Sequence, residues 1–154
     1  MLSRSLSAVV PALRANGREG AIGELLAALS PAHSSSGHPA AEAVLSRERT
    51  ASTAIGNHVA VPHAKWDGDF TIAVGVSADG VEFNAMDGKK VHVVFLVLSP
   101  RGRAVEHLKL LARIARLASD ERFWERMKSA GSADAISGII RAEEGAFQTP
   151  KGGC

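Results

Sequence analysis

The sequence predicts an α/β protein in which helices cover the faces of a central sheet. Three stretches rich in β-branched and apolar residues lie in the middle of the chain, at 58–63, 70–77 and 91–99. Stretches with the apolar spacing of amphipathic helices lie on both sides of this block, two before it and three after it. Strands flanked by helices in this order are typical of a sheet with helices packed against it.

The first helix is predicted over residues 19–30. Its apolar side chains follow the i, i+3, i+4, i+7 spacing of one helix face: Ile22, Leu25, Leu26 and Leu29. Pro31 and the polar residues after it end the helix and form a loop. We expect the two histidines of that loop, His33 and His38, to face solvent.

A second helix is predicted over residues 39–49. The proline at its first position is compatible with a first helical turn. Its apolar stripe consists of Ala40, Val44 and Leu45. This helix brings Arg47 and Arg49 to its C-terminal end, directly before the first strand region.

The first strand region reads ASTAIGNHVAVPHAK and contains two histidines in an apolar run. We predict a turn at Gly56-Asn57, an extended run over 59–61 and a stop at Pro62. His63 would then lie where a strand ends, and functional side chains of α/β proteins gather at strand ends.

The second and third strands are separated by turns. Residues 70–77 place Ile72, Val74 and Val76 in alternation with smaller side chains. Residues 91–99 are almost continuously apolar, which predicts a central strand covered on both faces. Between them, residues 78–90 contain the sequence Asp-Gly twice, and this pair indicates turns.

Three helices are predicted after the strands. The first, over 104–120, carries His107 in its first turn and has two adjacent apolar faces. One face consists of Leu108, Leu111, Ala115 and Ala118, and the other of Leu110, Ile114 and Leu117. Two shorter helices follow over 121–130 and 132–144, with Ser132 as the expected N-cap of the second.

Composition excludes several classes of protein. The chain has 18 basic and 16 acidic side chains, and a net charge of +2 does not predict binding to nucleic acid. No apolar run reaches the ~18 residues of a membrane helix, so no membrane insertion is expected. A single cysteine, Cys154, cannot form an internal disulfide, so a cytoplasmic location is expected. The GxxxxGK[ST] loop that holds nucleotide phosphates is missing, and we predict no cofactor.

Three of the six histidines are candidates for a functional role. His58 and His63 lie on one loop-strand unit, and His107 opens a helix that follows a strand, so their side chains could converge. A metal site is one alternative, but no HxH, HExxH or nearby carboxylate at ligand spacing accompanies them, and we predict no metal. For His92, between two valines of a strand, a role at the strand edge is favoured over a catalytic one.

A serine or cysteine hydrolase is a weaker alternative. The motif GxSxG is missing, and no carboxylate is placed to orient a histidine. Ser52 or Thr53 is expected instead to cap backbone amides at the turn that follows them.

A histidine nucleophile fits the candidate residues better. A neutral imidazole can take a phosphoryl group from another phosphohistidine or a similar high-energy donor. Arg47 can supply a planar fork of donors for the three equatorial oxygens of that group. His107, at the start of a helix, can add a hydrogen bond together with the helix dipole.

The stretch VLSRERTASTAIGNHVAVPHAK resembles a known signature. It is similar to the IIA domains of the bacterial phosphoenolpyruvate-dependent sugar phosphotransferase system, in the fructose/mannitol class that includes the stand-alone nitrogen-regulatory IIA proteins. The matching pairs are Arg47-Glu48, Ser52-Thr53, Ile55-Gly56 and Pro62-His63. The segments VEFNAMDGKKVHVVFLVLSP and EHLKLLARIARLASD are similar to the family's following segments in order and spacing.

This resemblance implies roles for the candidate residues. His63 would accept the phosphoryl group, on Nε2, from an HPr-type phosphohistidine protein. Arg47 would steady the group, and His107 would be the second active-site histidine. Two positions depart from the family pattern, because Ala54 and His58 stand where many members have glycine. His58 could be an anion contact, a competing acceptor or a tolerated surface side chain, and we favour the last because histidine adopts unusual backbone regions at modest cost.

The resemblance also implies the fold and the domain limits. The fold would be a three-layer α/β/α sandwich with a mixed central sheet of about four or five strands. We take residues 17–145 as this IIA domain and 146–154 as a flexible tail. Residues 1–16 form an N-terminal segment that is either an edge strand or partly flexible.

Two functions from different classes stay open. A phosphocarrier would either pass its phosphoryl group to a IIB component for sugar uptake or bind target proteins in one phosphorylation state only. We favour the regulatory type, because the 154 residues contain no fused IIB or IIC domain and no membrane segment. The alternative is a binding module of the same fold that is never phosphorylated, or a weak histidine metal site.

Overall fold

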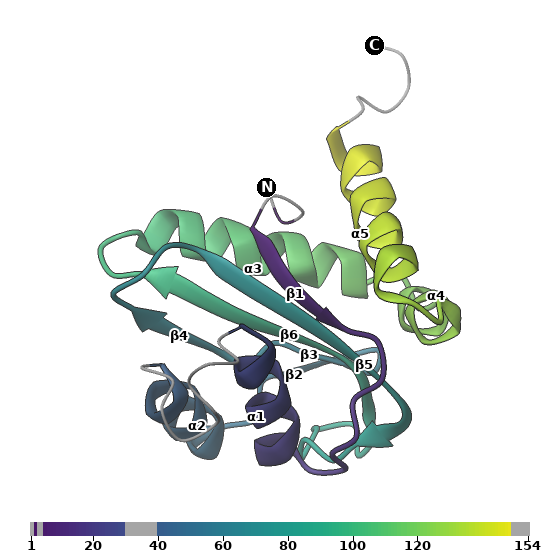
Figure 1. The fold of residues 1–154 in the computed structure, drawn as a ribbon, viewed down its shortest axis with the longest axis horizontal. Helices are drawn as coiled ribbons and strands as arrows, with labels where there is room; N and C mark the ends of the chain where they lie inside the picture. The colour runs from purple at the N-terminus through teal and green to yellow at the C-terminus, as the bar shows by residue number, and fades with distance from the viewer. Residues whose placement is uncertain (1, 3–4, 30–39, 149–154) are drawn as a thin grey trace.

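The computed structural model describes residue 2 and residues 5–29 and 40–148. In this part of the chain, six strands form one mixed sheet (Figure 1). The strands are β1 Leu6–Val10, β2 Ala54–Gly56, β3 Val59–Ala60, β4 His63–Trp66, β5 Thr71–Val81 and β6 Val91–Pro100. Their order is β1-β5-β6-β3-β2, and β4 also pairs with β6. The central pair β5 and β6 is antiparallel, whereas β1 runs parallel to β5, and both β3 and β4 run parallel to β6.

Helices cover both faces of this sheet (Figure 1). On one face lie α1 Arg18–Leu29 and α2 Ala41–Thr50, and on the other lie α3 Ala104–Ala118, α4 Phe123–Ser129 and α5 Ala133–Gln148. The predicted three-layer sandwich with a mixed sheet is therefore confirmed.

The two cores are built by alternation along β6. Val93, Phe95 and Val97 pack with α3 to α5, while Val94, Leu96 and Leu98 pack with α1 and α2. All six side chains are fully buried, which confirms that residues 91–99 form a central strand covered on both faces.

The single strand predicted over 58–63 is divided in the structure. Asn57 and His58 have positive φ angles of 50° and 63° and form the turn that joins β2 to β3. Pro62 has no N–H to donate, and it separates β3 from β4. His63 therefore follows the end of β3, as predicted, but it also begins a further strand, β4. This division is one reason why the sheet has six strands.

The strand over 70–77 also has different limits. β5 continues to Val81, through residues that were predicted as a turn. Gly80 has a φ of +89° and lies in a register shift between Val76 and Val81, so the first Asp-Gly pair makes a bulge rather than a turn. The second pair does make a turn, in which Gly88 N–H donates to the Ala85 carbonyl.

The two predicted apolar faces of α3 differ in how deeply they are buried. Leu110, Ile114 and Leu117 are buried against the sheet. Leu108 is 65% exposed and Ala115 is exposed, whereas Ala118 of the same predicted face is buried in the core and Leu111 packs against it. Only one side of a helix can face the sheet, and here Leu111 and Ala115 of the second apolar face line an open pocket.

The elements near the two ends of the described chain can be compared with the predicted domain limits, 1–16, 17–145 and 146–154. β1 lies within the N-terminal segment 1–16 and pairs with β5 at one end of the strand order. α5 continues to Gln148, three residues into the segment predicted as a tail. The loop that carries His33 and His38 and residues 149–154 lie outside the described residues.

Candidate functional site

His63 is half-buried at the start of β4, beside Val97 of β6. Its ring Nδ1 lies 2.8 Å from the Val61 carbonyl oxygen. A carbonyl can only accept a hydrogen bond, so Nδ1 of His63 carries a proton. In the neutral ring the other nitrogen, Nε2, therefore holds an unshared electron pair, which is the state that a nucleophile requires.

His107 lies next to His63. Its ring centre is 5.3 Å from that of His63, and its side chain is buried in the first turn of α3. Nδ1 of His107 is 2.6 Å from Oγ of Ser99, a fully buried residue near the end of β6. Ser99 thus fixes the second histidine. The sequence reasoning did not single it out, although it is the only hydroxyl residue in the apolar stretch 91–99.

Arg47 and His63 line one open pocket of about 390 Å³. Arg47 lies near the end of α2, and its Nη1 donates to the Ala51 carbonyl at 3.0 Å. The opposite wall comes from the second apolar face of α3, through Leu111, Ala112 and Ala115. The structure therefore brings all three principal candidates together: Arg47 shares the pocket with His63, and His107 contacts the same ring.

Glu48 holds the loop between α2 and β2. Unlike its neighbour Arg47, it is buried, with 1% of its surface exposed. Its carboxylate accepts hydrogen bonds from the Thr53 N–H at 3.0 Å and the Thr53 hydroxyl at 2.5 Å, and Arg18 Nη1 lies 3.8 Å away. Arg47 and Glu48 thus have different roles. The side chain of Arg47 lines the pocket, and the carboxylate of Glu48 holds the loop that also lines it.

Ser52 and Thr53 line the pocket, and their hydroxyls are used to hold the loop. Ser52 Oγ donates to the Phe83 carbonyl at 2.5 Å and accepts from the Ala54 N–H at 3.2 Å. Ser52 therefore does satisfy a backbone amide next to the turn, as predicted. Thr53 does not, since its hydroxyl donates to Glu48.

Replacing Glu48 with glutamine is expected to lower the free energy of unfolding by about 1–3 kcal/mol. An amide presents one NH₂ group where two donors now meet a carboxylate, so a buried donor loses its partner. Urea unfolding measures this difference. Glu42→Gln is the matched control on the same helix, because Glu42 is 86% exposed and we expect it to change stability by less than about 0.5 kcal/mol. Equal losses in the two variants would contradict the role given to Glu48.

Two imidazoles in the structure have lowered pKa values. Burial lowers the pKa of His107, and repulsion from His63, when that ring is protonated, and from Lys65 lowers it further. Burial also lowers the pKa of His92, against the opposing effect of its hydrogen bond to the Ser77 carbonyl. The unfolded chain would protonate both rings near their ordinary pKa of 6.5.

We therefore expect stability to decrease as the pH falls below about 6.5. Between the folded and unfolded pKa values the unfolded chain binds more protons than the folded chain. The stabilising contribution of the two rings is therefore complete above about pH 6.5 and is lost as the pH falls towards their folded pKa values. Each ring can contribute a slope of at most about 1.4 kcal/mol per pH unit. Urea unfolding at about pH 7.5 and about pH 5.5 measures the loss. His107→Gln should show a smaller loss than the unsubstituted chain, and equal losses would contradict this origin.

His58 is not part of the group around His63. The side chain of Asn57, the residue before it, donates to the Ala118 carbonyl at the end of α3, whereas His107 lies at the start. Eleven residues of α-helix separate these points by about 16 Å. The ring of His58 packs against Trp124, with centres 4.0 Å apart, and its Nδ1 donates to the Lys90 carbonyl at 2.8 Å.

The structure changes one expectation about His58 and one about His92. The positive φ of His58 confirms that this histidine occupies an unusual backbone region. It is, however, half-buried against Trp124 rather than a plain surface side chain. His92 lies on β6 in the middle of the strand order and stacks on Trp124 with centres 4.9 Å apart, so the prediction of a strand-edge role is wrong.

Two other kinds of feature are absent from residue 2 and residues 5–29 and 40–148. There, no group of three or more His, Cys, Asp or Glu side chains is arranged to hold a metal ion. No helix among the same residues combines the length and apolarity needed to cross a bilayer.

Comparisons with known proteins point to one family. A profile described as "Phosphoenolpyruvate-dependent sugar phosphotransferase system, EIIA 2" matches residues 5–143. A nitrogen regulatory protein of Bradyrhizobium diazoefficiens is 35% identical over 136 residues, covering 86% of this chain and 88% of that protein. A fructose-specific EIIABC component of Bacillus subtilis is 38% identical over 105 residues, covering 67% of this chain and 16% of that protein.

A solved structure agrees with these matches. The crystal structure of the nitrogen regulatory protein IIA-Ntr from Neisseria meningitidis superposes with a TM-score of 0.80 at 25% sequence identity. The superposition covers 90% of this chain and 98% of that chain. The strand order, the two helical layers and the pocket beside α3 thus lie within a fold that has been solved in a relative.

Proposed function

Because the chain belongs to the EIIA 2 family of the phosphoenolpyruvate-dependent sugar phosphotransferase system, we propose that it accepts a phosphoryl group on Nε2 of His63 and signals by its phosphorylation state. A phosphocarrier role is general to this family. The acceptor atom, the residues that assist it and the use of the phosphorylated form are specific to the proposal.

The observation that carries the proposal is the hydrogen bond between Nδ1 of His63 and the Val61 carbonyl. It assigns the proton to Nδ1 and leaves the electron pair on Nε2, without any need for a separate base. The bond also helps after transfer, because a ring that bears a phosphoryl group on Nε2 and a proton on Nδ1 is positively charged. The carbonyl dipole stabilises that charge.

The transfer needs no further reactant. The electron pair on Nε2 of His63 attacks the phosphorus of a phosphohistidine donor, forming a new N–P bond while the donor's N–P bond breaks. The donor's imidazole leaves with the electron pair of the broken bond and becomes neutral. Positive charge thus moves from one imidazole to the other, and both rings keep their remaining N–H protons.

Arg47 and His107 are proposed to bind the transferring group. The guanidinium of Arg47 is exposed, lines the same pocket as His63, and offers donors in a plane that suits phosphoryl oxygens. When the Ser99 hydroxyl donates to Nδ1 of His107, the proton of that ring lies on Nε2 and can be donated to a phosphoryl oxygen. A neutral ring suits this role, and the lowered pKa of His107 favours the neutral form.

A protein is the favoured donor, and an HPr-type phosphohistidine protein is proposed. Large apolar side chains are exposed on the rim of the site: Ile55 beside the pocket, and Val105 and Leu108 on the pocket side of α3. Exposed apolar groups that surround a polar centre are typical of protein contact surfaces. A small-molecule donor would not need them.

The regulatory role is favoured over transfer to a IIB component. A nitrogen regulatory relative corresponds to this chain over 88% of its length, whereas a fused fructose-specific relative corresponds over 16% and a stand-alone fructose-specific EIIA component over 67%. Phosphorylation adds about two negative charges and three acceptor oxygens to a surface with exposed apolar groups. That change is large enough to decide which partner binds.

The proposal is tested by locating the phosphate. The chain, labelled with ¹⁵N in its histidines, is incubated with a phosphorylated HPr-type protein and followed by intact mass and by imidazole NMR. We expect one acid-labile, base-stable phosphate, and shifts of the Nε2 resonance of His63 while its Nδ1 proton is retained.

Two results would contradict the proposal. A phosphate on another histidine, or on Nδ1 of His63, would remove the assigned acceptor. No addition with any competent donor would instead favour the alternative, a binding module of the same fold that is not phosphorylated.

A further inference from the structure

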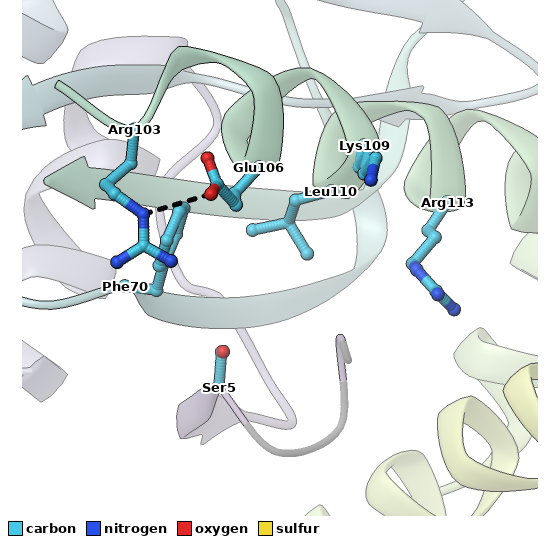
Figure 2. A pocket seen from close by; sticks show the side chains of 7 residues that line it. All are labelled: Ser5, Phe70, Arg103, Glu106, Lys109, Leu110 and Arg113. Atoms are coloured by element: carbon cyan, nitrogen blue, oxygen red, sulfur yellow. Dashed lines mark ion pairs between the residues drawn. The ribbon is translucent and has the colours of Figure 1, made fainter.

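A second pocket lies on the other side of α3 (Figure 2). It has a volume of about 290 Å³ and is lined by Glu106, Lys109, Leu110 and Arg113 of that helix and by Arg103, the residue before it. The pocket of His63 uses Leu111, Ala112 and Ala115 instead. At 100° per residue these two sets lie on roughly opposite sides of α3, so the two pockets are separate.

The second pocket combines a cationic rim with an apolar floor. Figure 2 shows Leu110 between Phe70 on one side and Arg113 on the other, with the Ser5 hydroxyl pointing towards the helix. Leu110 is buried and Phe70 is half-buried, so these two side chains form the floor. The residues that line the pocket include three cations, Arg103, Lys109 and Arg113, and one carboxylate, that of Glu106.

The three cations are not equally available. Arg103 Nε lies 3.2 Å from Glu106 Oε1, and its guanidinium lies 5.7 Å from the centre of the Phe70 ring. Arg113 Nη1 lies 3.9 Å from the buried carboxylate of Glu144. Within the residues that the structure describes, Lys109 makes no hydrogen bond or ion pair. It stands one helical turn, about 6 Å, from Arg113.

This arrangement indicates two places for an anionic group. Lys109 and Arg113 together form one, because neighbouring cations of this kind bind carboxylate or phosphate oxygens well. Arg103 forms the other, at the far end of the apolar floor, and it is partly neutralised by Glu106. A volume of about 290 Å³ equals that of about ten waters at ~30 Å³ each.

We propose that this pocket binds a small organic dianion of about ten non-hydrogen atoms, with one acidic group on Lys109 and Arg113, the other near Arg103, and its carbon skeleton over Leu110 and Phe70. The acidic groups are carboxylates or phosphates, and the geometry of the cations serves either. This inference does not depend on the function of His63.

The experiment is an NMR titration of the full chain, followed on backbone amides. The probes are adipate, which has two carboxylates, hexanoate, which has the same number of carbons but one carboxylate, and 4-phosphonobutyrate, in which a phosphonate replaces one carboxylate. We expect adipate or 4-phosphonobutyrate to cause saturable shifts at Ser5, Phe70 and the Lys109–Arg113 turn. Hexanoate should bind more weakly, and comparison of the two probes with two acidic groups identifies the preferred acidic group.

Three single substitutions test the site further. Two of them remove one positive charge each, and the third removes one negative charge. Lys109→Gln should weaken binding of the dianion by up to about fivefold, the effect of one exposed charge pair. Arg116→Gln removes the same charge from the same helix outside the pocket and should leave binding unchanged. Glu106→Gln should tighten binding, because it removes the competing carboxylate and releases Arg103.

Several outcomes would overturn the proposal. Equal weakening by Lys109→Gln and Arg116→Gln would mean that only the general positive charge of α3 is felt. Hexanoate that binds as tightly as adipate would refute the assignment to a dianion. A titration without saturable shifts, or weaker binding by a folded Glu106→Gln variant, would refute the site.

Discussion

His63→Ala is expected to abolish phosphoryl uptake from an HPr-type donor, while His58→Ala retains it at a rate within about twofold of the unsubstituted chain. The first substitution removes the imidazole that, among the residues the structure describes, lines the pocket together with Arg47 and has its Nδ1 bonded to a carbonyl. The second removes a ring that packs against Trp124 at the other end of α3. Intact mass after timed incubation with the phosphorylated donor measures both variants.

The comparison is informative because the two histidines have similar local bonding. In each, Nδ1 lies 2.8 Å from a backbone carbonyl, of Val61 for His63 and of Lys90 for His58. A free Nε2 is therefore common to both, and only their surroundings differ. Uptake that persists in a folded His63→Ala variant but is lost in His58→Ala would exchange the roles of the two rings and contradict the proposed acceptor.

The residue pattern predicted the layers of the fold better than its strand limits. Apolar continuity over 91–99 identified β6, because a strand covered on both faces needs apolar side chains on both. The division of 58–63 depended on two positive φ angles, at Asn57 and His58, and on the missing donor of Pro62. Such local geometry is stabilised by tertiary contacts, among them the hydrogen bond from Asn57 to the end of α3.

The two apolar faces of α3 illustrate a second limit. Periodicity marks both faces as apolar and does not say which one meets the sheet. The structure buries Leu110, Ile114 and Leu117, and it turns Leu111 and Ala115 towards the pocket of His63. An apolar row that seems to be extra core in the sequence is therefore the wall of the candidate site.

The candidate site residues could be proposed from the sequence, but their supports could not. Arg47, His63 and His107 were proposed because imidazole and guanidinium groups are suited to phosphoryl chemistry and because the surrounding stretch resembles a family signature. Their supports are the carbonyl of Val61, which depends on the local bend of the chain before β4, and Ser99, which meets His107 only when α3 packs beside the end of β6. A backbone carbonyl has no signature in a sequence, so the protonated nitrogen of His63 could not be derived from the residues alone.

Arg47→Ala is expected to slow phosphoryl transfer to His63 by about 30- to 1,000-fold. The guanidinium would stabilise charge on the transferring group by about 2–4 kcal/mol, and each 1.36 kcal/mol corresponds to a factor of ten in rate. Arg47 is exposed and its one hydrogen bond goes to the Ala51 carbonyl, so its removal should leave the fold intact. Rapid-quench measurement of phosphate transfer gives the rate, and urea unfolding checks the fold.

Arg49→Ala is the matched control for this effect. Arg49 also lies at the end of α2 and is 52% exposed, but it pairs with Glu19 and does not line the pocket. We expect its rate to stay within about twofold, while Arg47→Lys should recover only part of the loss because an ammonium lacks the planar fork. His107→Ala should slow transfer less than Arg47→Ala, since a neutral hydrogen bond contributes less than a charged one. Equal rates for Arg47→Ala and Arg49→Ala would mean that the guanidinium contributes only to the general charge of α2 and not to the transfer.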